Sequence, residues 1–156
     1  MGKVRGQSNM IATFVIYNLP NRECGSTKPP GEFSISADGI NKYMKFIDNI
    51  KAILGRVADA QAAFIIEPRA ISNLVAYKDN PKCQEVNAVY QTLITYALTS
   101  LNFPNVAVYL DGGDSVTLGP DDRIRAAAKV FSDVYELAKF PENVRGVRIP
   151  LSHSLS

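Results

Sequence analysis

Apolar residues occur along this chain in short continuous runs and in longer periodic segments, and the two kinds alternate. A short apolar run that ends in polar or proline-rich residues predicts a buried strand, whereas apolar residues that recur every three or four positions predict a helix. The expected strands are 12–17, 62–66, 106–110 and 146–150. The expected helices are 39–54, 70 to about 77, 84–101 and 120–139.

The run 62–66 is the segment around which we expect the fold to be organised. It contains no polar residue, which predicts a strand buried on both faces, and Pro68 prevents its continuation as a helix. The β-branched and aromatic run 12–17 is also expected to be a buried strand. Strands that alternate with helices predict an α/β fold with a parallel sheet, and four strands are too few to close a barrel.

Helix ends and faces follow from the same pattern. Asp38 is placed to cap the helix 39–54, and Lys78–Pro81 is expected to be a turn before the helix 84–101. The helix 120–139 begins with Pro120 and two aspartates, which suit a helix N-terminus. Its apolar stripe, from Ile124 to Leu137, is expected to face the core.

Length and charge then limit the possible functions. The 156 residues suit one domain, which we place at 11–150 between a disordered leader, 1–10, and a disordered tail, 151–156. The 17 basic and 15 acidic residues are interspersed, so neither a nucleic acid nor a membrane surface is an expected partner. No segment is apolar enough to span a membrane, and the first residues lack a secretory signal, which would place the chain in the cytoplasm if it is complete as written.

The cysteine and histidine content argues against a metal centre. Cys24 and Cys83 fit no metal-ligand spacing; they would form a disulfide in an oxidising compartment or remain small buried side chains in a reducing one. The single His153 lies in a Ser-rich tail, which argues against a histidine-dependent triad and a His-rich metal site. No glycine-rich phosphate-binding motif follows a strand, so we expect no cofactor and no metal.

Polar side chains follow three of the expected strands, at the sheet edge where α/β proteins place their chemistry. These side chains are Tyr17 with Arg22 and Glu23, then Glu67 with Arg69, then Asp111 with Asp114. Such carboxylates could serve acid–base chemistry, bind a hard cation, or only cap helices and pair with the arginines. The residue types alone leave these alternatives open.

Several separated motifs resemble glycoside hydrolase family 6, the cellobiohydrolases and endoglucanases that cleave β-1,4-glucan. The motifs run in register from about residue 11 to residue 147. They are Thr13-Phe-Val-Ile-Tyr-Asn-Leu-Pro-Asn-Arg-Glu-Cys24, Gly31-Glu-Phe-Ser-Ile-Ser-Ala-Asp-Gly39, Ile65-Ile-Glu-Pro68 with Ser72-Asn-Leu-Val75, Pro81-Lys-Cys83 and Leu101-Asn-Phe-Pro-Asn-Val-Ala-Val-Tyr-Leu-Asp111.

The resemblance implies about four strand–helix units of a distorted β/α barrel, an inverting mechanism and a secreted protein. It implies β-1,4-glucan or a cello-oligosaccharide as the partner, and a disulfide between Cys24 and Cys83. The family's assisting aspartate corresponds to Glu23, while Tyr17 and Asp111 are retained. Because such a partial barrel leaves strand edges uncovered, self-association is also expected.

The departures from the family pattern concern its chemistry. The proton donor falls on Arg69, whose guanidinium cannot act as an acid near neutral pH. The loop serine that helps to hold the attacking water falls on Pro29, and two sugar-site residues, a histidine and a tryptophan, fall on Asp114 and Thr117. The chain has no Trp for stacking on sugars.

Three hypotheses therefore remain. The chain is a family-6 glucanase with impaired activity, a noncatalytic glucan-binding protein, or a truncated gene product. Glu67 is expected to be structural and paired to Arg69, and replacement of the missing donor by Asp114 is left open.

Overall fold

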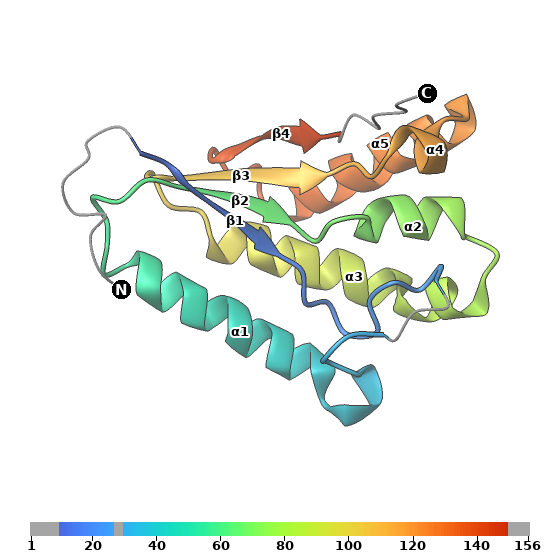
Figure 1. The fold of residues 1–156 in the computed structure, drawn as a ribbon, viewed down its shortest axis with the longest axis horizontal. Coiled ribbons are helices and arrows are strands. Elements are labelled where there is room, and N and C mark those ends of the chain that lie inside the picture. Colours follow the sequence, from blue (N-terminus) through green and yellow to red (C-terminus); the bar gives the residue numbers. More distant parts are fainter. Residues whose placement is uncertain (1–9, 27–29, 150–156) are drawn as a thin grey trace, which may run out of the picture.

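Four strands and their connecting helices make up the computed structural model, which describes residues 10–26 and 30–149 (Figure 1). The strands are β1 (Ala12–Ile16), β2 (Ala62–Ile66), β3 (Val106–Asp111) and β4 (Val144–Arg148). The helices are α1 (Gly39–Leu54), α2 (Ala70–Ala76), α3 (Pro81–Ser100), α4 (Ser115–Leu118) and α5 (Asp121–Leu137), with a 3₁₀ turn, η1, at Ile35–Ala37.

The sheet is parallel and has the order β1-β2-β3-β4, so each strand pairs with the next one in the chain. Because parallel crossovers are right-handed, a sequential order places the connecting helices on one face. Figure 1 shows α1, α3 and α5 on the same side of the sheet. All four carboxyl ends therefore lie at one edge, as expected for an α/β protein.

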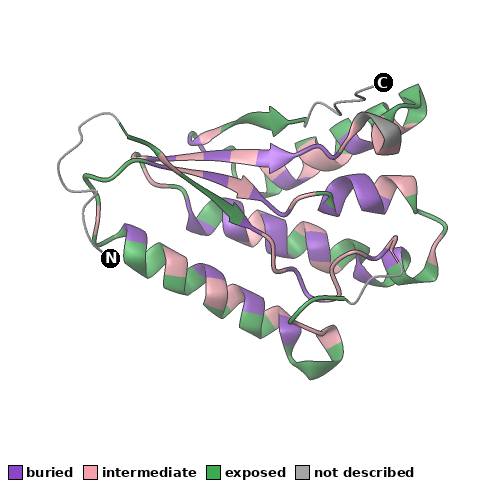
Figure 2. Ribbon diagram, viewed as in Figure 1, coloured by how far each residue is buried: buried purple, intermediate pink, exposed green. Residues whose placement is uncertain are grey.

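The core lies between this face of the sheet and the helices. Phe64, Ile66, Val108 and Leu110 point into it from β2 and β3, and α3 lies beneath the sheet and contributes the most buried residues of any helix. On β2 and β3 buried residues alternate with half-buried ones (Figure 2), because no helix of the described residues covers the opposite face. The expected burial of 62–66 on both faces is therefore wrong for Ala63 and Ile65.

The first strand is an edge strand and not a buried one. Thr13, Phe14 and Val15 are exposed, and Phe14 and Val15 retain 50% and 57% of their accessible surface. Helix α5 is likewise less buried than its periodicity suggested, since Ile124 and Leu137 are exposed and Ala127 and Val134 are its buried residues. Periodicity reports an apolar face but does not show whether a neighbour covers it.

Two helix starts also differ from the sequence-based expectation. Asp38 precedes α1 with a left-handed backbone (φ 62°) and makes no capping hydrogen bond; its carboxylate accepts from Asn41 Nδ2 at 2.6 Å instead. Helix α3 begins at Pro81 rather than at Gln84, because the Asn80 side chain caps it by accepting from the N–H of Lys82 and a proline fits the first turn.

The described part of the chain contains no helix long and apolar enough to cross a membrane. The expected leader (residues 1–9 of 1–10), the tail 151–156, Pro29, Pro150 and His153 lie outside the described residues.

Candidate functional site

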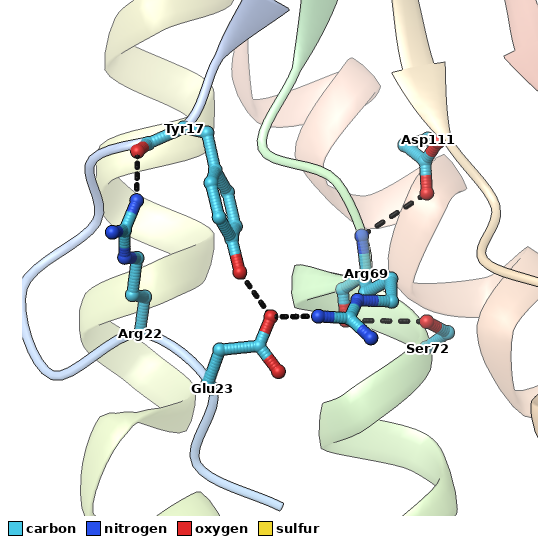
Figure 3. Close-up of polar contacts among 6 residues, drawn as sticks. All are labelled: Tyr17, Arg22, Glu23, Arg69, Ser72 and Asp111. Atoms are coloured by element: carbon cyan, nitrogen blue, oxygen red, sulfur yellow. Dashed lines mark hydrogen bonds and ion pairs between the residues drawn. The ribbon is translucent and has the colours of Figure 1, made fainter. Parts of the chain in front are cut away.

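Glu23 connects the polar side chains at the carboxyl edge of the sheet. Its carboxylate accepts hydrogen bonds from the hydroxyl of Tyr17, at the end of β1, and from Arg69 Nη2, at the start of α2, the latter at 2.5 Å (Figure 3). The side chain of Glu23 keeps 9% of its accessible surface, and that of Arg69 keeps 45%. Glu23 is thus a nearly buried carboxylate held by one neutral and one cationic donor.

Tyr17 is held on two sides. The guanidinium of Arg22 lies 4.3 Å from the centre of its ring, in a cation–π arrangement, and Arg22 Nη1 donates to the Tyr17 carbonyl at 2.6 Å. Partial burial and then the hydrogen bond to Glu23 raise the pKa of Tyr17. The phenol therefore stays protonated and remains a donor to Glu23 at neutral pH.

Arg69 is positioned through its backbone as well as its side chain. Its N–H donates to Asp111 Oδ1 at 3.0 Å, and its carbonyl accepts from Ser72 Oγ at 3.1 Å (Figure 3). The backbone of Arg69 is left-handed (φ 62°), as is that of Glu23 (φ 64°). Such conformations cost non-glycine residues about 1 kcal/mol or more, so the surrounding contacts must hold them in place.

Asp111 connects this cluster to β4. The buried carboxylate accepts from the N–H of Arg69 and of Gly113, and its second oxygen forms an ion pair with Arg148 Nη1 at 3.0 Å. Gly113 is required at this point, because its φ is +73° and a Cβ there would lie 2.3 Å from Ser72 Oγ.

Glu67 does not pair with Arg69, contrary to the expectation. Its side chain turns in the other direction, is 2% exposed, and accepts from the backbone N–H groups of Asn18 and Leu19. Burial raises the pKa of Glu67 to about 7, against the opposing effect of these N–H donors. Glu67 thus belongs to the interior beneath the site.

The loop that carries Glu23 is anchored at its far end by the disulfide Cys24–Cys83, which joins it to the first turn of α3. This confirms the pairing that the family resemblance implied. Tyr90 of α3 adds a second anchor, because its hydroxyl donates to the Asn21 carbonyl at 2.7 Å. A cavity of about 250 Å³ lies on the α3 side of the loop; Glu23 and Lys82 line it, whereas Tyr17 and Arg69 do not.

Asp114 and Thr117 lie together at the start of α4. Asp114 Oδ1 accepts from the N–H and the hydroxyl of Thr117, at 2.7 and 2.8 Å, so the aspartate caps this short helix. Asp114 is half-buried. Their part in sugar binding remains a prediction.

Sequence reasoning missed one charged partner, Arg148, and named Arg22 without its position. Arg148 had been assigned no role, although it lies at the carboxyl end of β4, where the rule that directed attention to the other three strand ends applies equally. The position of Arg22 over the Tyr17 ring had no sequence signal, because it depends on the path of the loop. Among the described residues, no group of three His, Cys, Asp or Glu side chains could hold a metal ion.

Comparison with known proteins shows extensive similarity over this region. The sequence model of Glycosyl hydrolases family 6 matches residues 2–153. The chain is 40% identical over 146 residues to a putative endoglucanase type B from Fusarium oxysporum, covering 94% of this chain and 30% of that protein. It is also 40% identical over 139 residues to exoglucanase 2 of Hypocrea jecorina, covering 89% of this chain and 30% of that one.

A solved structure shares the fold. Cellobiohydrolase II from Humicola insolens, in complex with glucose and cellotetraose, superposes with a TM-score of 0.86 at 37% identity. The match covers 89% of this chain and 39% of that one. The chain thus spans about 30% of the length of the relatives named above.

Proposed function

This chain belongs to family 6 of the glycosyl hydrolases, and we propose that it binds β-1,4-glucan at the Tyr17–Glu23–Arg69 edge with an impaired hydrolytic step. The observation that carries the proposal is the guanidinium of Arg69, 2.5 Å from the Glu23 carboxylate, at the position to which the family resemblance assigns the proton donor. Inverting glycosidases need one carboxylic acid to protonate the leaving oxygen and one carboxylate to activate water.

Arg69 does not release a proton near neutral pH. An arginine side chain stays protonated at neutral pH, and the hydrogen bond to Tyr17, followed by the charge of Glu23, raises the pKa of Arg69 above its ordinary value. Glu23 is held by both neighbours and would lose both contacts by turning towards another position. Glu67 is buried and accepts from the loop backbone, so it does not take over as donor. The leaving oxygen therefore departs without a proton.

The site keeps groups suited to sugar hydroxyls. A guanidinium has five N–H donors, and Arg69 is half-exposed with one of its nitrogens directed at Glu23. These features support β-1,4-glucan or a cello-oligosaccharide as the bound partner. The Cys24–Cys83 disulfide supports an oxidising, secretory environment for the chain.

Leaving-group dependence tests the proposal. A cello-oligosaccharide with its natural sugar leaving group needs protonation, whereas a nitrophenyl leaving group departs largely unaided. The unmodified chain is expected to hydrolyse the natural substrate 10²–10⁴-fold more slowly than Arg69→Asp, with a much smaller difference on the aryl substrate. Arg125→Asp, which makes the same charge change on the exposed face of α5, should behave like the unmodified chain.

Rapid cleavage of the natural cello-oligosaccharide by the unmodified chain would overturn the proposal. Equal rates for Arg69→Asp and Arg125→Asp on both substrates, with retained binding, would favour the second candidate, a noncatalytic glucan-binding protein. The ion pair that ties Glu23 to Arg69 favours that candidate, because it engages the assisting carboxylate as well. Calorimetric titration with a cello-oligosaccharide measures the binding, and the absence of heat would contradict both candidates.

A further inference from the structure

We propose that Glu67 is a positioning residue for the loop that carries Tyr17 and Glu23, and that its protonation changes how firmly the start of this loop is held. An effect of Glu67 on glucan binding rests on the proposed function, whereas its effect on the loop does not. It starts from a carboxylate that is fully buried without a cationic partner in the described ion pairs.

The contacts of Glu67 are directed at one short segment. Its backbone N–H donates to the Ile16 carbonyl at 2.7 Å, which extends the β1–β2 pairing by one residue. Its side chain then accepts from the N–H of Asn18 at 3.0 and 3.2 Å and from the N–H of Leu19 at 3.3 Å. Glu67 thus binds residues on both sides of Tyr17.

The left-handed backbone of Glu67 makes this geometry possible. With φ at 45°, the side chain turns back over the end of β1 instead of following the chain towards Arg69. Leu19, which follows the bonded segment, is 1% exposed and packs into the core. The loop therefore leaves β1 in a direction set by Glu67, and its other end is set by the disulfide at Cys24.

Three ionisable side chains surround Glu67 from three segments. Tyr43 of α1 is fully buried, its hydroxyl has no hydrogen-bond partner among the described residues, and its nearness to Glu67 lowers the pKa of that carboxyl. The charge of Glu67 also acts on Tyr90 of α3, and the charge of Arg22 acts on Glu67 from the loop. Because burial outweighs the effect of Arg22 and of the N–H donors, the pKa of Glu67 is raised to about 7.

The two protonation states of Glu67 form hydrogen bonds of different strength with the loop. The carboxylate presents two charged acceptor oxygens to the N–H groups of Asn18 and Leu19, and charge-assisted hydrogen bonds are about twice as strong as neutral ones. The protonated acid keeps one good acceptor and offers its O–H to Tyr43. We therefore expect a firmly held segment 17–19 above pH 7 and a more loosely held one below it.

NMR titration of the amide groups tests this without any ligand. In the unmodified chain, the amide signals of Tyr17, Asn18, Leu19 and Glu23 are expected to move together between pH 5 and 9 with a midpoint near 7. Glu67→Gln keeps an acceptor oxygen but does not titrate, so these movements should disappear while the fold is retained. Glu136→Gln, an exposed glutamate on α5, should titrate like the unmodified chain.

Two outcomes would overturn the inference. The first is no movement of the Asn18 and Leu19 signals over this range, or the same movement in Glu67→Gln. The second is a titration confined to Asn18 and Leu19, with Tyr17 and Glu23 unaffected, which would make Glu67 a structural residue only. Cello-oligosaccharide affinity at pH 5.5 and 8.5 is measured separately: absence of binding at both pH values counts against the proposed function and leaves the NMR result standing.

Discussion

At the scale of single residues, one substitution decides the chemistry of this edge of the sheet. An ionised carboxylate at position 69 would repel Glu23, whereas the guanidinium of Arg69 attracts it and forms a 2.5 Å contact. At the position to which the family resemblance assigns a proton donor, Arg69 donates a hydrogen bond to Glu23. Under the proposed function, the same guanidinium therefore replaces the acid and holds the Glu23 carboxylate in an ion pair.

Glu67 gives a residue-scale prediction for stability. Its pKa is about 7 in the folded chain against 4.5 as the ordinary value. Between these pH values the folded state holds a proton on Glu67 that the unfolded state has lost. Protonation of Glu67 therefore raises the free energy of unfolding of the whole chain; this contribution is complete below about pH 4.5 and disappears as the pH rises through 7. Relative to Glu67→Gln, the unfolding free energy of the unmodified chain should fall by roughly 3 kcal/mol from pH 4 to pH 8.

Urea denaturation of both chains across this pH range provides the measurement. Only the difference between the two chains is interpreted, because the other titrating groups are common to both. A difference that stays constant with pH, or that grows in favour of the unmodified chain at high pH, would contradict the raised pKa.

At the scale of elements, the loop between β1 and η1 is held by the rigid helix α3. The disulfide and the Tyr90 hydroxyl both connect it to α3, so Glu23 is located by a helix rather than by the loop itself. In the described part of this loop, Asn21 and Glu23 are non-glycine residues with a left-handed backbone. Such a backbone path must be held by contacts with other parts of the chain. The disulfide therefore matters for the site as well as for overall stability.

Removal of the disulfide should destabilise the chain measurably. It closes a segment of 59 residues, for which the chain-entropy estimate is about 4 kcal/mol. A Cys24→Ala, Cys83→Ala double variant should lose that amount in denaturant unfolding. Reductant should destabilise the unmodified chain similarly and leave the double variant unchanged. Free thiols in the denatured, unreduced protein would argue against the bond.

At the scale of the whole molecule, the part of the chain that the structure describes covers one face of the sheet with helices and places no further strand beside β1 or β4. β1 and β4 are its terminal strands; they expose Phe14, Val15 and Val147, and Ile149, which follows β4, is exposed as well. Strand edges with unpaired backbone groups next to exposed apolar side chains promote pairing with another chain. The edge strand of a second copy of this chain could form such a pair.

We therefore expect concentration-dependent self-association in sedimentation velocity experiments. Val15→Lys places a charge on the exposed edge strand and should shift the distribution towards monomer. Thr92→Lys, which adds the same charge on the exposed side of α3, serves as the control and should associate as the unmodified chain does. A single monomeric species at all concentrations would contradict self-association through these edges.

The positions of the elements were predictable from the sequence, because apolar runs and helical periodicity are local properties. The strands at β2 and β3, the helix at α1 and the parallel α/β class were predicted from these patterns, and the structure confirms them. The strand-end rule also led to Tyr17, Glu23, Arg69 and Asp111, which the structure brings together. Burial was less predictable, as the exposed β1 shows, since it depends on what covers a face.

The pairing of charges was decided by the tertiary structure alone. Glu67 and Arg69 are two residues apart, and sequence reasoning paired them with each other. Left-handed backbones at both positions send one side chain inwards to the N–H groups of Asn18 and Leu19 and leave the other at the edge with Glu23. The sequence by itself determined which groups reach this edge; the backbone path beyond each strand determined which of them meet, because hydrogen bonds and ion pairs act only at short range.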